Sequence, residues 1–287
     1  MNNTISIASS AMLVELSISG WTARKLDKKV SAEIDVAKGT QTQAGNYNKN
    51  LLAGTGFLDS ITKYAANARA WHISQTLPWS DSGVRLLPVS NFIAYKEQLN
   101  KLEDNYTALV GKFVEAYPNL VTAAAFQLGN LFDRNEYPDA DKILHKFKFS
   151  YNFFPVPQAG DFRVDIGEDA KQELALSCQH AYEDRLNNAM SEAWQRLHKC
   201  LSNISERLTV NDDGKEKIFR DSLVENAHEL IDLLTHLNIT KDPKLEQARV
   251  ELFNTIGHHD AESLRSSVVA KESVKSKVDA ILSKFEF

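Results

Sequence analysis

Two long stripes of apolar residues repeat with alternating spacings of three and four, the pattern of a helix that packs one face against another helix. The first stripe consists of Phe92, Tyr95, Leu99, Leu102, Tyr106, Leu109 and Phe113. The second consists of Met190, Trp194, Leu197, Leu201, Ile204 and Leu208. Between them, residues 147–153 alternate aromatic and polar side chains, which is the period of a strand. We therefore expect a mainly α fold with a small antiparallel β element (α+β), built on a long antiparallel, coiled-coil-like helix pair.

The composition also favours a mainly helical protein. The chain has 287 residues, and 43% of them are apolar, so it is long enough to bury a sizeable core. It has 12 glycines and 7 prolines, too few for the many turns of an all-β fold. Its net charge of −5 indicates no general affinity for nucleic acid or membranes, so such a role would require a local basic patch.

Four segments of the sequence are predicted to be strands. They lie at about 13–19, 84–89, 146–156 and 161–166. The last two are joined by residues 157–160, Pro-Gln-Ala-Gly, which are typical of a turn, and we expect a β-hairpin flanked by the two long helices. An isolated hairpin is only marginally stable in water, so the other two strands are expected to complete a small sheet.

The sequence suggests three regions. Residues 1–11 are expected to be a flexible tail. Residues 12–210 are expected to form an elongated helical domain that contains the small sheet, with a flexible polar loop at 38–50. Residues 211–287 are expected to be a C-terminal helical region that packs on this domain.

The sequence indicates a cytoplasmic protein. Residues 1–12 contain no basic start followed by an apolar run, so we expect no signal peptide, and no apolar stretch is long enough to suggest a membrane span. Cys178 and Cys200 lie on one predicted helix at a separation of roughly 33 Å, which excludes a disulfide. Free thiols in a chain without a secretion signal fit a reducing compartment.

No motif for catalysis, cofactor binding or metal binding stands out. The Gly-Thr-Gly sequence at 54–56 lacks the Gly-Lys-Ser/Thr that a phosphate-binding loop requires. The His-His-Asp sequence at 258–260 is more typical of a solvated turn than of a metal site. No serine or cysteine has the neighbours of an activated nucleophile. We therefore expect a protein that is not an enzyme and that needs no cofactor or metal.

One basic patch is the main candidate for a binding site. A helix is predicted from Trp21 to about Ala37, and its first turns carry the candidate residues Trp21, Arg24, Lys25, Lys28 and Lys29. The four cations would lie on one side of such a helix. A cationic face beside a tryptophan can hold a phosphate backbone and stack a base, or it can dock the acidic face of a protein. It can equally be a solvated helix whose tryptophan packs on the sheet.

Trp79 and Arg85 are the other candidate partner-binding residues. Trp79 belongs to an aromatic region with Trp71, and tryptophans are frequent interface anchors, although core packing explains such residues at least as well. Arg85 lies in the extended segment that precedes the first long helix.

Three segments carry a resemblance to a known family. They are Leu16-Ser17-Ile18-Ser19-Gly20-Trp21-Thr22-Ala23-Arg24-Lys25, then Gly83-Val84-Arg85-Leu86-Leu87, and the aromatic strand from Phe147 to Pro155. In this order they resemble an uncharacterised family of bacteriophage and bacterial proteins, over about residues 13–210. Its members are often encoded beside an AAA+ ATPase of the MoxR or CobS type, sometimes with a von Willebrand-type partner. The resemblance implies a phage protein that acts in the host cytoplasm as an accessory or adaptor to that ATPase.

Three functional hypotheses follow from these patterns. The leading one is a non-enzymatic α-helical interaction or adaptor protein that self-associates or binds an AAA+ ATPase. The second is a nucleic-acid-binding protein that uses the basic residues at 21–29. The third is a virion or scaffold component, which would form stable high-order assemblies without an ATPase.

Overall fold

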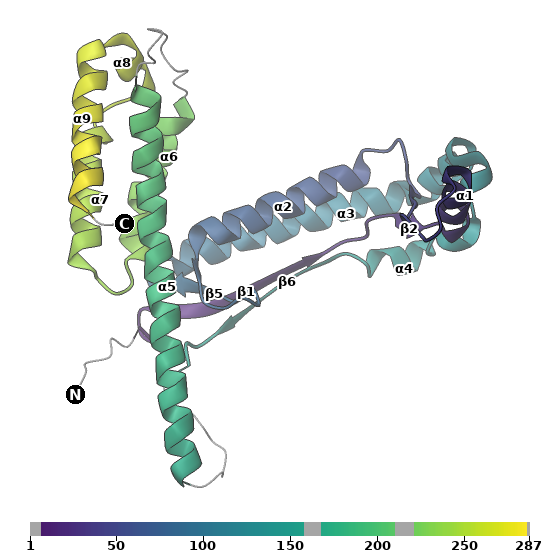
Figure 1. Ribbon diagram of the computed structural model, residues 1–287, viewed down its shortest axis with the longest axis horizontal. Helices are drawn as coiled ribbons and strands as arrows, with labels where there is room; N and C mark the ends of the chain where they lie inside the picture. The colour runs from purple at the N-terminus through teal and green to yellow at the C-terminus, as the bar shows by residue number, and fades with distance from the viewer. Residues whose placement is uncertain (1–6, 158–167, 210–220, 286–287) are drawn as a thin grey trace. The chain divides into compact units, whose positions relative to one another are not determined.

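The described chain forms two compact units in a computed structural model that describes residues 7–157, 168–209 and 221–285 (Figure 1). The first unit comprises Met1–Glu15, His72–Tyr95 and Asn152–Phe287, and the second comprises Leu16–Trp71 and Lys96–Tyr151. Each unit is therefore assembled from segments that are far apart in the sequence. The domain boundary expected at residues 210 and 211 lies outside the described residues.

The described strands form a four-stranded and a two-stranded sheet. The larger sheet has the order β4-β5-β1-β6 and consists of β1 (Ala11–Ser19), β4 (Leu77–Pro78), β5 (Arg85–Pro88) and β6 (Lys148–Phe154). Strand β5 is antiparallel to both β1 and β4, with Ala11 opposite Pro88 and Leu77 opposite Leu86. Strands β1, β5 and β6 lie where the sequence indicates strands. The segment 161–166, and with it the expected hairpin, lies outside the described residues.

The first unit is mainly helical. Its long and short helices are α5 (Glu168–Leu208), α6 (Asp221–Leu237), α7 (Pro243–Ile256), α8 (Ala261–Ser266) and α9 (Val268–Lys284). Helices α6, α7 and α9 pack on α5, as the green to yellow part of Figure 1 shows. Helix α7 starts as its sequence indicates, because Asp242 is its N-cap and Pro243 its first residue.

The second unit holds most of two long helices. They are α2 (Phe57–Gln75) and α3 (Phe92–Leu128), which lie side by side in Figure 1. Its shorter helices are α1 (Lys28–Lys38) and α4 (Ala140–Leu144). The described residues also form the 3-10 helices η2 (Gly129–Leu131) and η3 (Arg134–Glu136) in this unit and η1 (Val89–Asn91) in the first unit. The smaller sheet pairs β2 (Arg24–Leu26) antiparallel with β3 (Asn48–Asn50). Strand β3 lies in the segment that was expected to be a flexible loop.

The two heptad stripes contribute to different apolar clusters, the first through its residues 102–113. In the second unit, Tyr106 and Phe113 of α3 are buried together with Ile61 of α2. In the first unit, Leu197 and Ile204 of α5 are buried together with side chains of α6, α7 and α9. The structure therefore confirms a mainly α fold with a small antiparallel sheet, but the expected packing of one stripe on the other is wrong. The reason is that α2 and the C-terminal helices have apolar faces of their own, which cover the stripes.

Part of the expected N-terminal tail is packed. Ile7 is buried, and its amide donates a hydrogen bond of 3.0 Å to the hydroxyl of Tyr182. Ala11, which was also placed in the tail, begins β1. The expectation of a flexible tail is therefore wrong from Ile7 onward, because this residue contributes an apolar side chain to the core of the first unit.

Candidate interaction surface

Residues 21–29 form a strand and a helix start instead of the expected helix from Trp21. Ala23 has a positive φ of 51°, which turns the chain, and its carbonyl accepts a hydrogen bond of 2.7 Å from the amide of Leu51. Strand β2 then pairs with β3. Helix α1 begins only at Lys28, because the Asp27 carboxylate accepts hydrogen bonds from the amides of Lys29 and Val30 at 3.1 Å each.

A buried lysine fixes this arrangement. The Nζ atom of Lys49 lies 2.7 Å from Glu136 Oε2 and 3.3 Å from Asp27 Oδ2, and it donates a hydrogen bond of 2.9 Å to the carbonyl of Leu131. Lys49 is 5% exposed, so it joins β3, the N-cap of α1 and η3 through a largely dry ion network. Lys49 is not among the residues predicted for the site, because a lysine in a polar segment carries no signal that it will be buried.

The pKa values in this network favour its charged form. The pKa of Asp27 is lowered mainly by the hydrogen bond from the Val30 amide, and further by Lys49, against a smaller opposing effect of burial. Burial is the largest single influence on Lys49 and acts to lower its pKa. The hydrogen bonds and charges of Glu136 and Asp27 together outweigh burial, so the pKa of Lys49 is raised. At neutral pH Lys49 is therefore a cation and Asp27 an anion.

Trp21 packs on α3 and does not stand free beside the cations. Its ring lies edge-on to Tyr117 at a centroid distance of 5.9 Å and lies 6.4 Å from Phe113. The side chain is half-buried. The ring is therefore largely occupied by contacts within the second unit, and the expected pairing of a free tryptophan with a cationic helix face is wrong.

The four candidate cations are exposed, but they do not share one face. Arg24 and Lys25 are successive residues of β2 and so point to opposite sides of the strand, while Lys28 and Lys29 lie in the first turn of α1. None of the four forms an ion pair within the described part of the chain. The positive charge at this end of the second unit is therefore available to a partner.

An exposed stripe with small apolar side chains runs along α1 beside these cations. We call it the α1 stripe; it consists of Lys29, Ala32, Glu33, Val36 and Ala37, which line a shallow, open groove along the helix. Their spacing of three and four places them on one side of the helix. Val36 is 81% exposed, and the neighbouring Ile34 is 45% exposed. Exposed apolar side chains are common on protein surfaces, but here they lie beside the four exposed cations, where a partner could contact both kinds of side chain.

Trp79 and Arg85 belong to the first unit and serve its packing. Trp79 is 5% exposed, and its ring contacts Tyr182 at 5.7 Å between centroids and lies under the Arg185 guanidinium at 6.0 Å. It is therefore not the exposed interface anchor that was considered, because its large ring is used in the core.

Arg85 and Arg196 bind the carbonyl end of α2. Arg85 donates from Nε to Thr76 Oγ1 at 2.7 Å and from Nη2 to the Thr76 carbonyl at 3.0 Å. Arg196 of α5 donates to the carbonyls of Ile73, Ser74 and Thr76 at 2.7–2.9 Å. Burial and the nearby Arg196 charge lower the pKa of Arg85. Arg85 is therefore engaged within the fold, and its role in binding a partner stays a prediction.

No protein-family model, curated protein or solved structure matches the chain. In the part of the chain that the structure describes, no group of three or more His, Cys, Asp or Glu side chains could hold a metal ion. Among the described helices, none combines the length and the apolar character needed to cross a membrane. The function has to be inferred from the residues and their geometry alone.

Proposed function

We propose that this chain is a non-enzymatic interaction protein that binds another protein through β2 and the α1 stripe. The observation that carries the proposal is the combination of exposed apolar and unpaired cationic side chains. Val36 is 81% exposed, and Lys28 and Lys29 have no ion pair among the described residues. The partner that fits this surface is a protein with an apolar patch bordered by acidic side chains.

The two kinds of side chain would contribute differently to binding. Covering a single valine side chain stabilises a complex by roughly 1.5–3 kcal/mol, and Ala32 and Ala37 allow a partner to approach α1 closely. The cations would act mainly on the rate of association and on the orientation of the partner. The Lys49 network holds β2 and the start of α1 in place before binding, which reduces the entropy lost on association.

The specific role that we propose is an accessory or adaptor to an AAA+ ATPase of the MoxR or CobS type. Its support is the resemblance of residues 13–210 to a family whose members are often encoded beside such an ATPase. An ATPase of this type from the same source as the chain is therefore the first partner to test.

The test is a binding measurement, by biolayer interferometry, between the full chain and that ATPase. Val36→Gln is expected to weaken binding by about tenfold, because it removes apolar contact area. The double variant Lys28→Glu, Lys29→Glu is expected to slow association and to make it less dependent on salt. Matched controls are Ile93→Gln and Lys63→Glu, which change an exposed apolar residue and an exposed lysine elsewhere. Absence of binding by the unmodified chain, or an equal loss in the controls, would contradict the proposal.

Nucleic-acid binding is a second candidate, because Arg24, Lys25, Lys28 and Lys29 are all exposed. The packing of Trp21 and the opposite directions of Arg24 and Lys25 count against it. Binding through phosphates would weaken steeply between about 50 and 200 mM salt and would be lost in an Arg24→Glu, Lys28→Glu variant. Fluorescence anisotropy with a single-stranded and a double-stranded oligonucleotide measures both effects.

Size-exclusion chromatography with light scattering distinguishes an adaptor from a virion or scaffold component. An adaptor is expected to elute as a monomer or small oligomer and to shift when the ATPase is added. A stable high-order assembly that forms without the ATPase would favour the scaffold role instead.

A further inference from the structure

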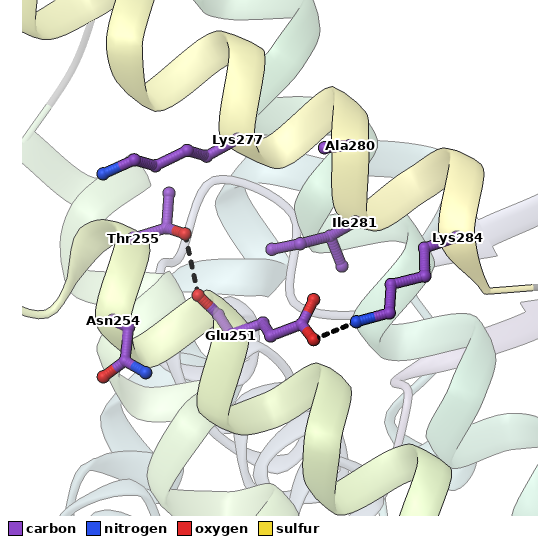
Figure 2. A pocket seen from close by; sticks show the side chains of 7 residues that line it. All are labelled: Glu251, Asn254, Thr255, Lys277, Ala280, Ile281 and Lys284. Carbon is purple, nitrogen blue, oxygen red and sulfur yellow. Dashed lines mark hydrogen bonds and ion pairs between the residues drawn. The ribbon is translucent and has the colours of Figure 1, made fainter.

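The first unit has a hollow of about 420 Å³ between α7 and α9 (Figure 2). Helix α7 contributes Glu251, Asn254 and Thr255, and α9 contributes Lys277, Ala280, Ile281 and Lys284. The hollow is open to solvent along one side, so a ligand in it would keep part of its surface exposed. The hollow shares no residue with β2 or α1, so it is independent of the surface proposed above. We refer to it as the α7–α9 hollow.

The charges around the hollow leave one cation without a partner. The Glu251 carboxylate pairs with Lys284 and also accepts a hydrogen bond of 3.0 Å from Gln247 Nε2. Lys277 forms no ion pair within residues 7–157, 168–209 and 221–285 and is exposed. An anion that enters the hollow would therefore meet a free ammonium group at Lys277, while Lys284 is held by Glu251.

The floor between the two lysines is apolar. Figure 2 shows Lys277 and Lys284 reaching from α9 on either side of Ile281, whose side chain points toward α7. The seven-residue spacing of the lysines corresponds to about 10.5 Å along the helix, enough to seat a small ring between them. The Thr255 hydroxyl donates its hydrogen to the Glu251 carbonyl at 2.7 Å, so it offers no hydrogen to an anion. An anionic ligand would therefore place its charged group at Lys277 and its apolar part against the surface between the two lysines.

We propose that the α7–α9 hollow binds a small organic anion, a carboxylate or a phosphate monoester attached to a flat apolar group. Lys277 contacts the anionic group, and the stems of the two lysines contact the apolar group, together with the small part of Ile281 (3%) that is exposed. Glu251 limits affinity, because its charge opposes the ligand and occupies Lys284. Removing the Glu251 charge is expected to strengthen binding of the anion. This effect distinguishes a ligand site from surface lysines that merely attract anions.

The test is a ligand-observed NMR titration of the full chain with benzoate, phenyl phosphate, inorganic phosphate and neutral benzamide. Saturable binding of benzoate, phenyl phosphate or both is expected, and the comparison of the two identifies the anionic group. Inorganic phosphate and benzamide are expected to bind several-fold more weakly, because each lacks one half of the required chemistry. Lys277→Gln is expected to weaken binding about three- to fivefold, and Glu251→Gln to strengthen it about threefold.

The matched control is Lys244→Gln, the same change at an exposed lysine of α7 that does not line the hollow. It is expected to leave the affinity unchanged. The proposal is overturned if neither aryl anion shows saturable binding, or if inorganic phosphate binds as tightly as phenyl phosphate. It is also overturned if Lys244→Gln weakens binding as much as Lys277→Gln, or if Glu251→Gln fails to strengthen it.

Discussion

At the scale of single residues, Lys49 determines the form of the proposed interaction surface. Its ammonium group lies between Asp27 and Glu136, and both carboxylates are only 15–16% exposed. Without this cation, two partly buried negative charges would be left without compensation near the start of α1. The position of α1, and with it the α1 stripe, therefore depends on a residue that does not itself reach the surface.

Replacing this lysine is expected to destabilise the fold. Lys49→Met should lower the free energy of unfolding by about 2–4 kcal/mol, because one partner of an ion network is removed while the carboxylates stay. Urea denaturation followed by circular dichroism measures this change. Lys63→Met, at an exposed lysine of α2, is the control and should alter stability by less than about 0.5 kcal/mol. Similar small effects in both variants would contradict the role given to Lys49.

His72 gives the first unit a dependence on pH. Burial, assisted by the Arg85 charge, lowers the pKa of His72 from 6.5 to about 4, and the ring shares a hydrogen bond of 2.7 Å with the Tyr95 hydroxyl. Between pH 4 and 6.5 the unfolded chain gains a proton that the folded chain does not, so the free energy of unfolding rises with pH and levels off above this window. The difference amounts to at most about 3 kcal/mol.

The measurement is a series of urea denaturations between pH 4 and 7.5. His72→Gln is expected to reduce the slope of stability against pH across the window. His258→Gln, at an exposed histidine, should retain the slope. An unchanged slope in His72→Gln would show that another group carries the effect.

At the scale of elements, the carbonyl end of α2 is stabilised by arginines from β5 and α5. Three carbonyls of residues 73–76 receive hydrogen bonds from Arg196, and Arg85 adds further bonds to Thr76. Carbonyls at a helix end lack partners within the helix, and positive charge there also complements the helix dipole. The end of α2 is thus defined by side chains that are distant in the sequence.

Removal of the Arg196 guanidinium is expected to destabilise the first unit. Arg196→Met should lower the thermal unfolding temperature and reduce the free energy of unfolding by about 1–3 kcal/mol, because several carbonyls lose a charged donor. Arg249→Met is the comparison, since Arg249 pairs with Glu246 one turn away on the same helix. Its effect should stay below about 1 kcal/mol. The reverse order of the two effects would contradict this account of the α2 terminus.

The elements also show what the sequence can and cannot predict. Local signals sufficed for the start of α7, where Asp242 and Pro243 act within one turn. The Asp27 cap was equally local and could have placed the start of α1 correctly, but the turn at Ala23 and the pairing of β2 with β3 involve residues near 50. A heptad stripe defines an apolar face and says nothing about which helix covers it. The partners of α3 and α5 could therefore not be deduced from spacing, nor could the burial of Lys49.

At the scale of the whole molecule, each unit has its own apolar cluster. In the first unit the stripe of α5 is covered by the helices that follow it, and residues 221–285, which contain those helices, supply more than half of the buried residues of that cluster. The C-terminal helices are therefore part of the core of this unit. They do not form a separable appendage.

A truncation after residue 209 is expected to prevent stable folding of the first unit. Leu197, Leu201 and Ile204 are fully buried in the full chain and would lose their cover. The truncated chain should aggregate or bind the dye ANS, and it should lose more helical circular dichroism signal than the deleted helices account for. A truncated chain that stays monomeric with no dye binding would show that another element covers the α5 stripe.

The discontinuous make-up of the two units sets the order in which they can form during synthesis. The second unit ends at Tyr151, so all of its residues have been made before α5 begins. Leu77 and Leu86, on β4 and β5, are fully buried in the cluster that includes α5, and they lack the cover of that helix until it leaves the ribosome. During this interval short apolar strands are open to other nascent chains. The pace of translation between β6 and the C-terminal helices should therefore influence how much folded protein a cell obtains.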